Sequence, residues 1–276
     1  MPVIRISDLT DPRVAEYHGV ADPAAIARSG RFVAEGRLVV ERVIARTVEV
    51  SAFTIESVLL SDAALTAMEA VIRAVPQVPV FVCPASEFAQ LAGLNLHRGC
   101  LALVQRPPEP SVESLVGPAR TLLVLERVGN PDNIGGIFRS AAAFGVDAIL
   151  LSPGCGDPLY RKAIRTSMAA ALTVPFGWLT PWPDRLQQLR ADGYEIAALT
   201  PQPPSLTLAE YADIRRQGGR PRLALLLGTE GPGLTSDALA QADVRVRIPM
   251  VPAVDSLNVA VACGIALSHL APAPVS

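Results

Sequence analysis

The sequence predicts an α/β protein built from two regions, a small α/β domain followed by a larger one with a mostly parallel sheet. Half of the 276 residues are hydrophobic and the formal net charge is only -2, so the chain can bury one or two cores. A proline-rich stretch at residues 107–118 lacks periodic apolar residues and is predicted to be a linker. After it, short apolar runs alternate with helical segments, which is typical of a parallel sheet covered by helices.

The first region, residues 1–106, alternates helical and extended patterns. Strands are predicted at residues 56–61, 79–84 and 99–106, with a short helix beginning at residue 85. Ser61 is expected to cap a further helix, whose inner face carries Leu65, Met68 and Ile72. The first helix is predicted over residues 31–46, because four apolar side chains fall on one helical face, namely Val39, Val40, Val43 and Ile44.

The second region, residues 119–276, contains five apolar runs that are predicted to be strands, at 121–127, 147–153, 194–201, 222–228 and 244–250. Ligands of open parallel sheets bind beyond the carboxyl ends of the strands. The loops that follow these strands are therefore where chemistry is expected.

Composition excludes several classes of protein. No apolar run reaches the roughly 20 residues of a membrane-spanning helix, and the N-terminus is too polar for a secretory signal. The four cysteines are far apart and form no CxxC pair, so neither a metal site nor a disulfide framework is indicated. We expect a globular cytoplasmic protein without a bound metal.

The first of three polar loops follows the strand at 121–127. It offers Asn130 or Asn133 as a helix cap, and the pair Gly135 and Gly136 lets a ligand or another backbone approach. Arg139 lies under two turns into the helix that follows. A capped helix with a surface arginine explains the same residues, so this loop alone leaves both interpretations open.

The second loop, residues 228–234, is rich in glycine. It lacks the lysine of a P-loop and the spacing of a dinucleotide-binding loop, so phosphate binding is disfavoured. A strand that ends at Gly228 exposes backbone groups that can bind an adenine edge or a neighbouring backbone. A tight turn that needs left-handed glycines is the structural alternative.

The third loop, residues 248–258, precedes a strongly apolar helix that we expect to be buried on nearly all sides. Asp255 or Ser256 is expected to cap this helix. The triplet Ser256-Leu257-Asn258 then lies at a helix N-terminus, where negative charge developing on a substrate oxygen is stabilised. A plain helix cap remains the alternative.

In this order and spacing, the three loops resemble the motifs of the SpoU family of RNA ribose 2′-O-methyltransferases, in the SPOUT superfamily. The resemblance runs from Thr121 to about Leu270. The first region is similar to the RNA substrate-binding domain that precedes the catalytic domain in many members, through its segments FVAEG and GCLALVQRP. The resemblance implies S-adenosylmethionine as cofactor, RNA as substrate, a deep trefoil knot formed by threading the C-terminal segment, and a homodimer.

The resemblance also assigns roles to residues of this chain. Contacts to the cofactor are expected from Leu227, Gly228, Ile248, Pro249, Met250 and Leu257. Positions around the reacting ribose are expected for Asn133, Arg139, Glu230, Ser256 and Asn258. Arg139 is expected to grip a phosphate and stabilise the forming alkoxide, because a guanidinium does not act as a base. Pro252 stands where many members have glycine, which leaves the shape of the cofactor loop open.

RNA binding is not evident from the net charge, because the parts of the chain before and after Pro108 each have one more acidic than basic residue. Any contact with RNA must come from local patches. The candidates are Arg28, Arg31, Arg37, Arg42, Arg46, Arg161, Lys162 and Arg165, and solvated helix faces explain each of them as well. Ribosomal RNA is the expected substrate, with transfer RNA as the other choice. A non-catalytic RNA-binding protein that keeps the fold and a methyltransferase acting on an RNA base are the alternatives.

Overall fold

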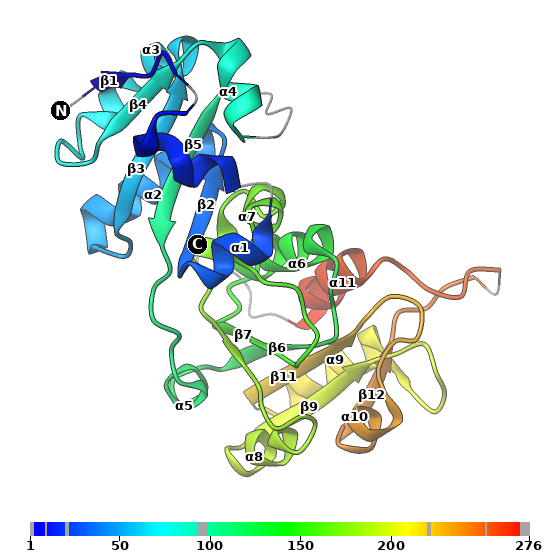
Figure 1. Ribbon diagram of the computed structural model, residues 1–276. Helices are drawn as coiled ribbons and strands as arrows, with labels where there is room; N and C mark the ends of the chain where they lie inside the picture. Colours follow the sequence, from blue (N-terminus) through cyan, green and yellow to red (C-terminus); the bar gives the residue numbers. More distant parts are fainter. Residues whose placement is uncertain are drawn as a thin grey trace. The chain divides into compact units, whose positions relative to one another are not determined.

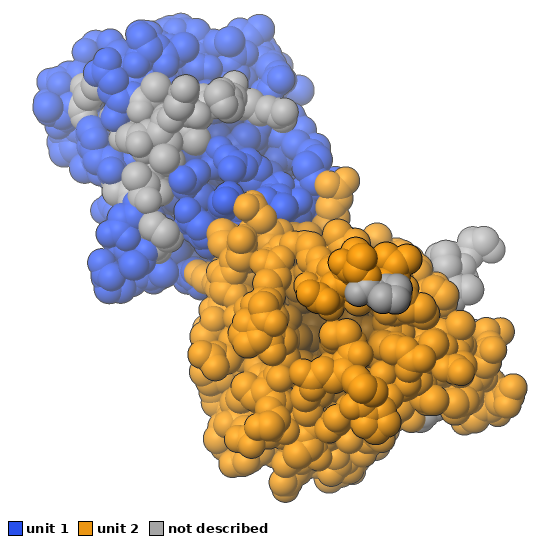
Figure 2. All heavy atoms as spheres, turned by 90° about the vertical axis from the view of Figure 1, so that its right-hand side faces the viewer, with its two compact units in different colours: residues 1–108, 159–169 blue, residues 109–158, 170–276 orange. Residues whose placement is uncertain are grey.

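A computed structural model of the protein describes residues 3–8, 10–19, 22–92, 99–219, 222–251 and 253–270 (Figure 1). The chain forms two compact units, which Figure 2 shows in different colours. Unit 1 comprises residues 1–108 and 159–169, and unit 2 comprises residues 109–158 and 170–276. Within the described residues, no helix has the length and apolarity needed to cross a membrane.

Unit 1 is built on a five-stranded sheet with the order β1-β4-β3-β5-β2. Strands β3 and β4 run parallel, whereas β5 runs antiparallel to both β3 and β2. The strands are β1 (Val3–Arg5), β2 (Arg31–Glu35), β3 (Ile55–Ser61), β4 (Val80–Cys83) and β5 (Cys100–Gln105). The helices are η1 (Pro12–Gly19), α1 (Pro23–Arg28), α2 (Arg37–Val50), α3 (Asp62–Ile72), α4 (Ala85–Ala92) and α7 (Arg161–Thr166).

The expected strands at 56–61, 79–84 and 99–106 are confirmed as β3, β4 and β5. Ser61 caps α3, since its side chain accepts a hydrogen bond from the Ala64 N–H. The helix expected over 31–46 is wrong in its first part, because residues 31–35 form β2 and pair with β5. Gly36 has φ +93°, which no helical residue adopts, and it separates the strand from α2.

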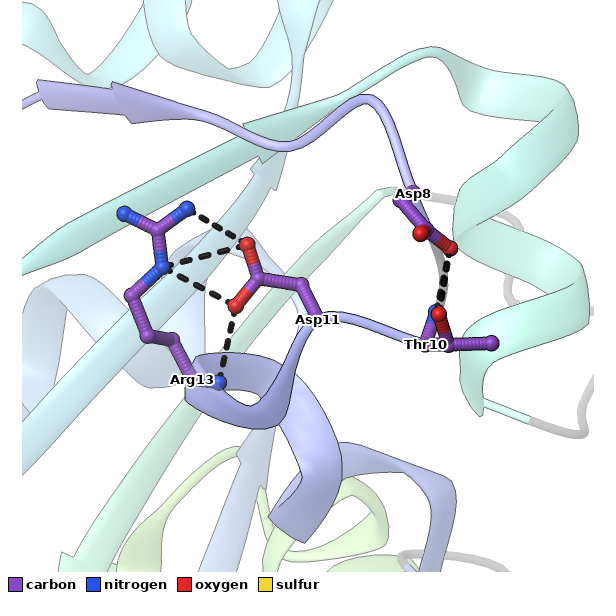
Figure 3. Close-up of polar contacts among 4 residues, drawn as sticks. All are labelled: Asp8, Thr10, Asp11 and Arg13. Carbon is purple, nitrogen blue, oxygen red and sulfur yellow. Dashed lines mark hydrogen bonds and ion pairs between the residues drawn. The ribbon is translucent and has the colours of Figure 1, made fainter.

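The start of η1 is fixed by two carboxylates (Figure 3). Asp8 accepts hydrogen bonds from the backbone N–H and the hydroxyl of Thr10. Asp11 accepts from the side chain and the backbone N–H of Arg13, and these hydrogen bonds lower the pKa of Asp11 to about 2. The turn that precedes η1 is thereby held by local side-chain hydrogen bonds.

Unit 2 is built on a seven-stranded sheet with the order β10-β12-β9-β11-β6-β7-β8, in which every pair is parallel. The strands are β6 (Thr121–Glu126), β7 (Ala148–Leu151), β8 (Phe176–Trp178), β9 (Tyr194–Leu199), β10 (Leu206–Thr207), β11 (Arg222–Gly228) and β12 (Val244–Arg247). The helices are α5 (Val112–Val116), α6 (Pro131–Ala143), η2 (Ala170–Leu172), α8 (Arg185–Ala191), α9 (Leu208–Gln217), α10 (Ser236–Ala240) and α11 (Val259–Leu270). The expected mostly parallel sheet and its five expected strands are confirmed, and the short β8 and β10 were not predicted.

Helices cover both faces of this sheet (Figure 1). One face packs on α5, α8 and α10 through a single apolar cluster that includes Leu122 and Val124 of β6. Alternate strand residues point to the other face, which carries α6 and α11. Within the segment expected as a linker, residues 107–118, the structure forms α5, whose Leu115 and Val116 are buried.

Candidate active site

The glycine-rich loop closes directly over the end of β11. Thr229 and Gly233 form an antiparallel bridge, and Gly231 and Gly233 have positive φ angles. A Cβ atom on Gly228 would lie 2.4 Å from the carbonyl carbon of Gly233 and 2.5 Å from the Leu234 nitrogen. Only glycine fits at Gly228, because the loop folds back onto the strand at this point.

A cavity of about 450 Å³ opens beside this loop, at the carboxyl edge of the sheet. Its size suits a ligand as large as a nucleoside. The segments that line it follow three strands: residues 199–202 after β9, 227–234 at the end of β11, and residues between 248 and 262 after β12. The loop after the strand predicted at 194–201 lines the cavity through Thr200 to Gln202, although none of these residues was among the expected site residues.

Most of the expected site residues line this cavity. They are Leu227, Gly228, Glu230, Ile248, Met250, Ser256, Leu257 and Asn258. Pro249 is exposed and is not among the lining residues. Pro252 lies outside the described residues.

Asn258 joins the three loops. Its Nδ2 donates hydrogen bonds to Asn133 Oδ1 at 2.8 Å and to Glu230 Oε1 at 2.5 Å. Its Oδ1 accepts from the N–H groups of Ala260 and Val261. Asn258 therefore caps α11, and the expected capping by Asp255 or Ser256 is wrong. The same side chain ends the third loop and links it to the first and the second.

The first loop packs closely on α11. Asn130 caps α6 by accepting a hydrogen bond from the Asp132 N–H. Asn133, which follows Asp132 in the first turn of the helix, is buried. A Cβ atom on Gly136 would lie 2.8 Å from the Ala260 methyl carbon, so this glycine permits the close approach of α6 and α11. The contact holds Asn133 beside Asn258.

Arg139 lies apart from this group. It is exposed on α6 and is not among the residues that line the cavity. It follows Asn133 by six positions, which places the two side chains about 120° apart around the helix axis. The structure of one chain thus brings Asn133, Glu230, Ser256 and Asn258 together and leaves Arg139 on the flank of α6.

A buried carboxylate binds Thr235, the residue that follows the glycine-rich loop. Glu126, the last residue of β6, is 1% exposed. It accepts hydrogen bonds from the Trp182 indole at 2.8 Å and from the N–H and hydroxyl of Thr235 at 2.8 and 2.7 Å. Sequence patterns did not single out Glu126, because its partners are far away along the chain.

The charges at the cavity are acidic. Glu230 and Asp255 line it, and no Lys, Arg or His is among its lining residues. Burial raises the pKa of the Cys263 thiol in α11 to about 12, so this thiol stays protonated and is not a nucleophile. The described residues contain no cluster that could hold a metal ion. The cavity can thus bind a ligand of nucleoside size through backbone groups, apolar side chains and amide or carboxylate oxygens.

Several arginines considered for RNA binding already have partners in unit 1. Glu35 accepts from Arg161 at 2.7 Å and from Arg165 at 2.6 Å. Arg31 pairs with Glu16 and Glu56, and Arg42 donates to the Met168 carbonyl. The carboxylates paired with Arg31, Arg161 and Arg165 reduce the positive charge that these arginines can offer to RNA.

Comparisons with known proteins agree with this geometry. Residues 120–268 match the model of the SpoU rRNA Methylase family. An uncharacterized tRNA/rRNA methyltransferase of Mycobacterium tuberculosis is 40% identical over 266 residues, covering 95% of this chain and 89% of its own length. A 23S rRNA (guanosine-2′-O-)-methyltransferase, RlmB, of Nitrosomonas europaea is 32% identical and covers 68% of this chain and 71% of its own.

Solved structures share the fold over both units. An rRNA methyltransferase from Sinorhizobium meliloti has a TM-score of 0.80 at 23% identity and covers 98% of each chain. A structure described as an RNA 2′-O ribose methyltransferase has a TM-score of 0.75 at 25% identity and covers 97% of this chain and 98% of its own. The family model spans all three loops that surround the cavity, and the chain belongs to the SpoU rRNA methylase family.

Proposed function

We propose that the protein is an S-adenosylmethionine-dependent methyltransferase that modifies the 2′-hydroxyl of a ribose in RNA. The observation that carries the proposal is the side chain of Asn258, which joins the loops after β6, β11 and β12 at the wall of one cavity. The relative from Nitrosomonas europaea, which is named as a 23S rRNA guanosine 2′-O-methyltransferase, supports ribosomal RNA as the substrate. Transfer RNA is the other substrate that the names of the relatives support.

The residues present fit S-adenosylmethionine. The cavity has the volume for a nucleoside with an amino-acid tail. Gly228 lets the glycine-rich loop fold back over the end of β11 at the wall of the cavity, and Leu227, Ile248, Met250 and Leu257 offer apolar surface to an adenine. When bound, S-adenosylmethionine supplies an electrophilic methyl group on a sulfonium. Pro249 is proposed to contribute through its backbone, since its side chain is exposed.

The chain's own residues then have to align a ribose and ease the loss of its 2′-proton. Alignment alone can contribute roughly 7 to 11 kcal/mol to such a reaction. Ser256 and Asn258 lie at the N-terminus of α11, where the helix dipole stabilises a developing negative charge. Asn133 and Glu230 fix the orientation of the Asn258 amide.

Arg139 is proposed to bind the phosphate next to the reacting ribose and to stabilise the alkoxide. Its exposed position on α6 leaves the guanidinium free to reach a ribose held by its own subunit or by a partner. The proposal includes a homodimer. It is supported by a stripe of incompletely buried residues on the apolar helix α11, namely Val261, Gly264, Ile265 and Ser268. The expectation that this helix is buried on nearly all sides is therefore wrong.

The proposal also includes a deep trefoil knot, in which the segment before α11 is threaded through a loop of the chain. It is supported by the loops after β9, β11 and β12, which surround the same cavity, and by the packing of α11 on α6. Unit 1 is proposed to bind the RNA substrate, and a relative that matches 95% of this chain supports a shared two-unit design. The proposed place of action is the cytoplasm.

Replacing Arg139 tests the assignment of the site. Arg139→Ala should abolish methyl transfer to RNA, because the phosphate and the alkoxide lose their cation. Binding of S-adenosylmethionine, measured by calorimetry, should survive, since Arg139 does not line the cavity. Arg139→Lys is the matched control and should keep part of the activity, because it retains the charge without the planar fork. Full activity of the alanine variant would refute the role of Arg139.

A further inference from the structure

A further exposed arginine, Arg127, lies at the carboxyl edge of the sheet. Arg127 follows β6 directly, and its neighbour Glu126 pairs in register with Gly228, where the cavity begins. The side chain of Arg127 is exposed, and its guanidinium has no hydrogen-bond or ion-pair partner among the described residues. Several other arginines of unit 2 are paired, for example Arg190 with Asp243.

Arg127 is held in an unusual conformation. Its φ is +55°, in the left-handed region that residues with a side chain rarely adopt. The conformation is held by the Arg127 N–H, which donates to Ser152 Oγ at 3.0 Å, and by the Val128 carbonyl, which accepts from the Gly156 N–H at 2.9 Å. Glycine at position 127 would adopt this conformation without the cost, so the arginine lowers the stability of the turn. Strained residues of this kind cluster at functional sites.

The loop after β7 lies against this side chain. Gly154 has φ +87°, and a Cβ atom there would lie 3.7 Å from Arg127 Cγ. The stem of Arg127 therefore lies beside Gly154, and the side chain is exposed at the surface.

An RNA substrate needs cations at this edge. Each nucleotide carries a phosphate, whereas the cavity itself is lined by Glu230 and Asp255 and by no basic residue. Arg127 begins the loop that joins β6 to α6, and Arg139 lies in α6 itself. Both are exposed, and a guanidinium fork matches the oxygens of a phosphate.

We propose that Arg127 is a substrate-positioning residue that binds a backbone phosphate of the RNA close to the reacting nucleotide. The inference rests on the proposed function, because it takes RNA as the substrate. Arg127 holds the RNA strand through one of its phosphates and makes no contact with the cofactor cavity.

The experiment compares Arg127→Gly with Arg120→Ala. Arg120 is an exposed arginine that precedes the other end of the same strand and is the matched control. RNA affinity is measured by fluorescence anisotropy over a range of salt concentrations, S-adenosylmethionine affinity by calorimetry, and stability by thermal unfolding. Arg127→Gly should weaken RNA binding about tenfold, the loss expected for one charge-assisted hydrogen bond, and lower the salt dependence by about one phosphate contact.

The same variant should unfold at a higher temperature than the wild type, because glycine adopts the left-handed conformation without strain. Its affinity for S-adenosylmethionine should not change, and Arg120→Ala should bind RNA as the wild type does. Wild-type RNA affinity in Arg127→Gly would overturn the proposal, and so would an equal loss in Arg120→Ala. If the wild type binds RNA but makes no 2′-O-methyl product, the proposed function fails. The anisotropy measurement still tests whether Arg127 contacts RNA.

Discussion

Asn258 performs two tasks with the two ends of one amide, and substitutions can separate them. Its oxygen caps α11 by accepting from Ala260 and Val261. Its nitrogen donates to Asn133 and Glu230. Loss of a helix cap costs about 1 kcal/mol, and loss of the donor leaves the buried Asn133 oxygen unpaired, which costs about 1 to 3 kcal/mol.

Asn258→Ala loses both functions, so its free energy of unfolding should fall by about 2 to 4 kcal/mol. Asn258→Ser keeps a capping oxygen and loses only the amide donor, so its free energy of unfolding should fall by about 1 to 3 kcal/mol, which is about 1 kcal/mol less than in the alanine variant. Both variants lack the amide nitrogen, so both should lose most methyl transfer. The difference in stability between the two variants should therefore report the cap, whereas their shared loss of activity should report the donor.

Urea unfolding measures the stability of each variant, and transfer of a labelled methyl group to RNA measures activity. Full activity of Asn258→Ser would refute the reasoning, because the bonds to Asn133 and Glu230 would then be dispensable. Equal stability of the serine and alanine variants would show that the capping oxygen contributes nothing.

Three further substitutions test other parts of the site. Gly228→Ala should lower the affinity for S-adenosylmethionine at least tenfold by calorimetry, because the new Cβ would lie 2.4 Å from Gly233 and force the loop to shift; unchanged affinity would contradict the role of this close contact. Glu230→Gln should weaken the binding of S-adenosylmethionine, a cation, more than the binding of neutral S-adenosylhomocysteine. The ratio of the two dissociation constants should change about fivefold, because two charges 4 Å apart in water interact by ~1 kcal/mol. An unchanged ratio would exclude this electrostatic preference. Val261→Glu, on the exposed stripe of α11, should convert a dimer to a monomer in light scattering, and a wild type that is already monomeric at micromolar concentration would contradict the proposed homodimer.

The elements that the sequence predicts correctly are those whose signals are local. Ser61 caps α3, and Asn130 with Pro131 begins α6, because capping residues act on the next few N–H groups. The glycine-rich loop is evident from the sequence for the same reason, since its left-handed turns need glycine at Gly231 and Gly233.

The features that could not be predicted depend on partners far away along the chain. The segment 31–35 has apolar residues that also suit a helix, and pairing with β5 makes it a strand. Three residues near the start of α11 can cap a helix, and the bonds to Asn133 and Glu230 select Asn258. Glu126 ends an apolar strand, and only the fold brings Trp182 and Thr235 to it.

Mass spectrometry of nucleosides tests the central claim most directly. RNA from the host, or ribosomal RNA lacking the modification, is incubated with the purified protein and S-adenosylmethionine bearing a deuterated methyl group, and is then digested to nucleosides. The labelled methyl should appear on the ribose 2′-oxygen of one nucleoside, and Arg139→Ala should not produce it. A labelled methyl on a base would show that the cavity serves another reaction, and RNA that is bound but never labelled would show a binding protein without catalysis.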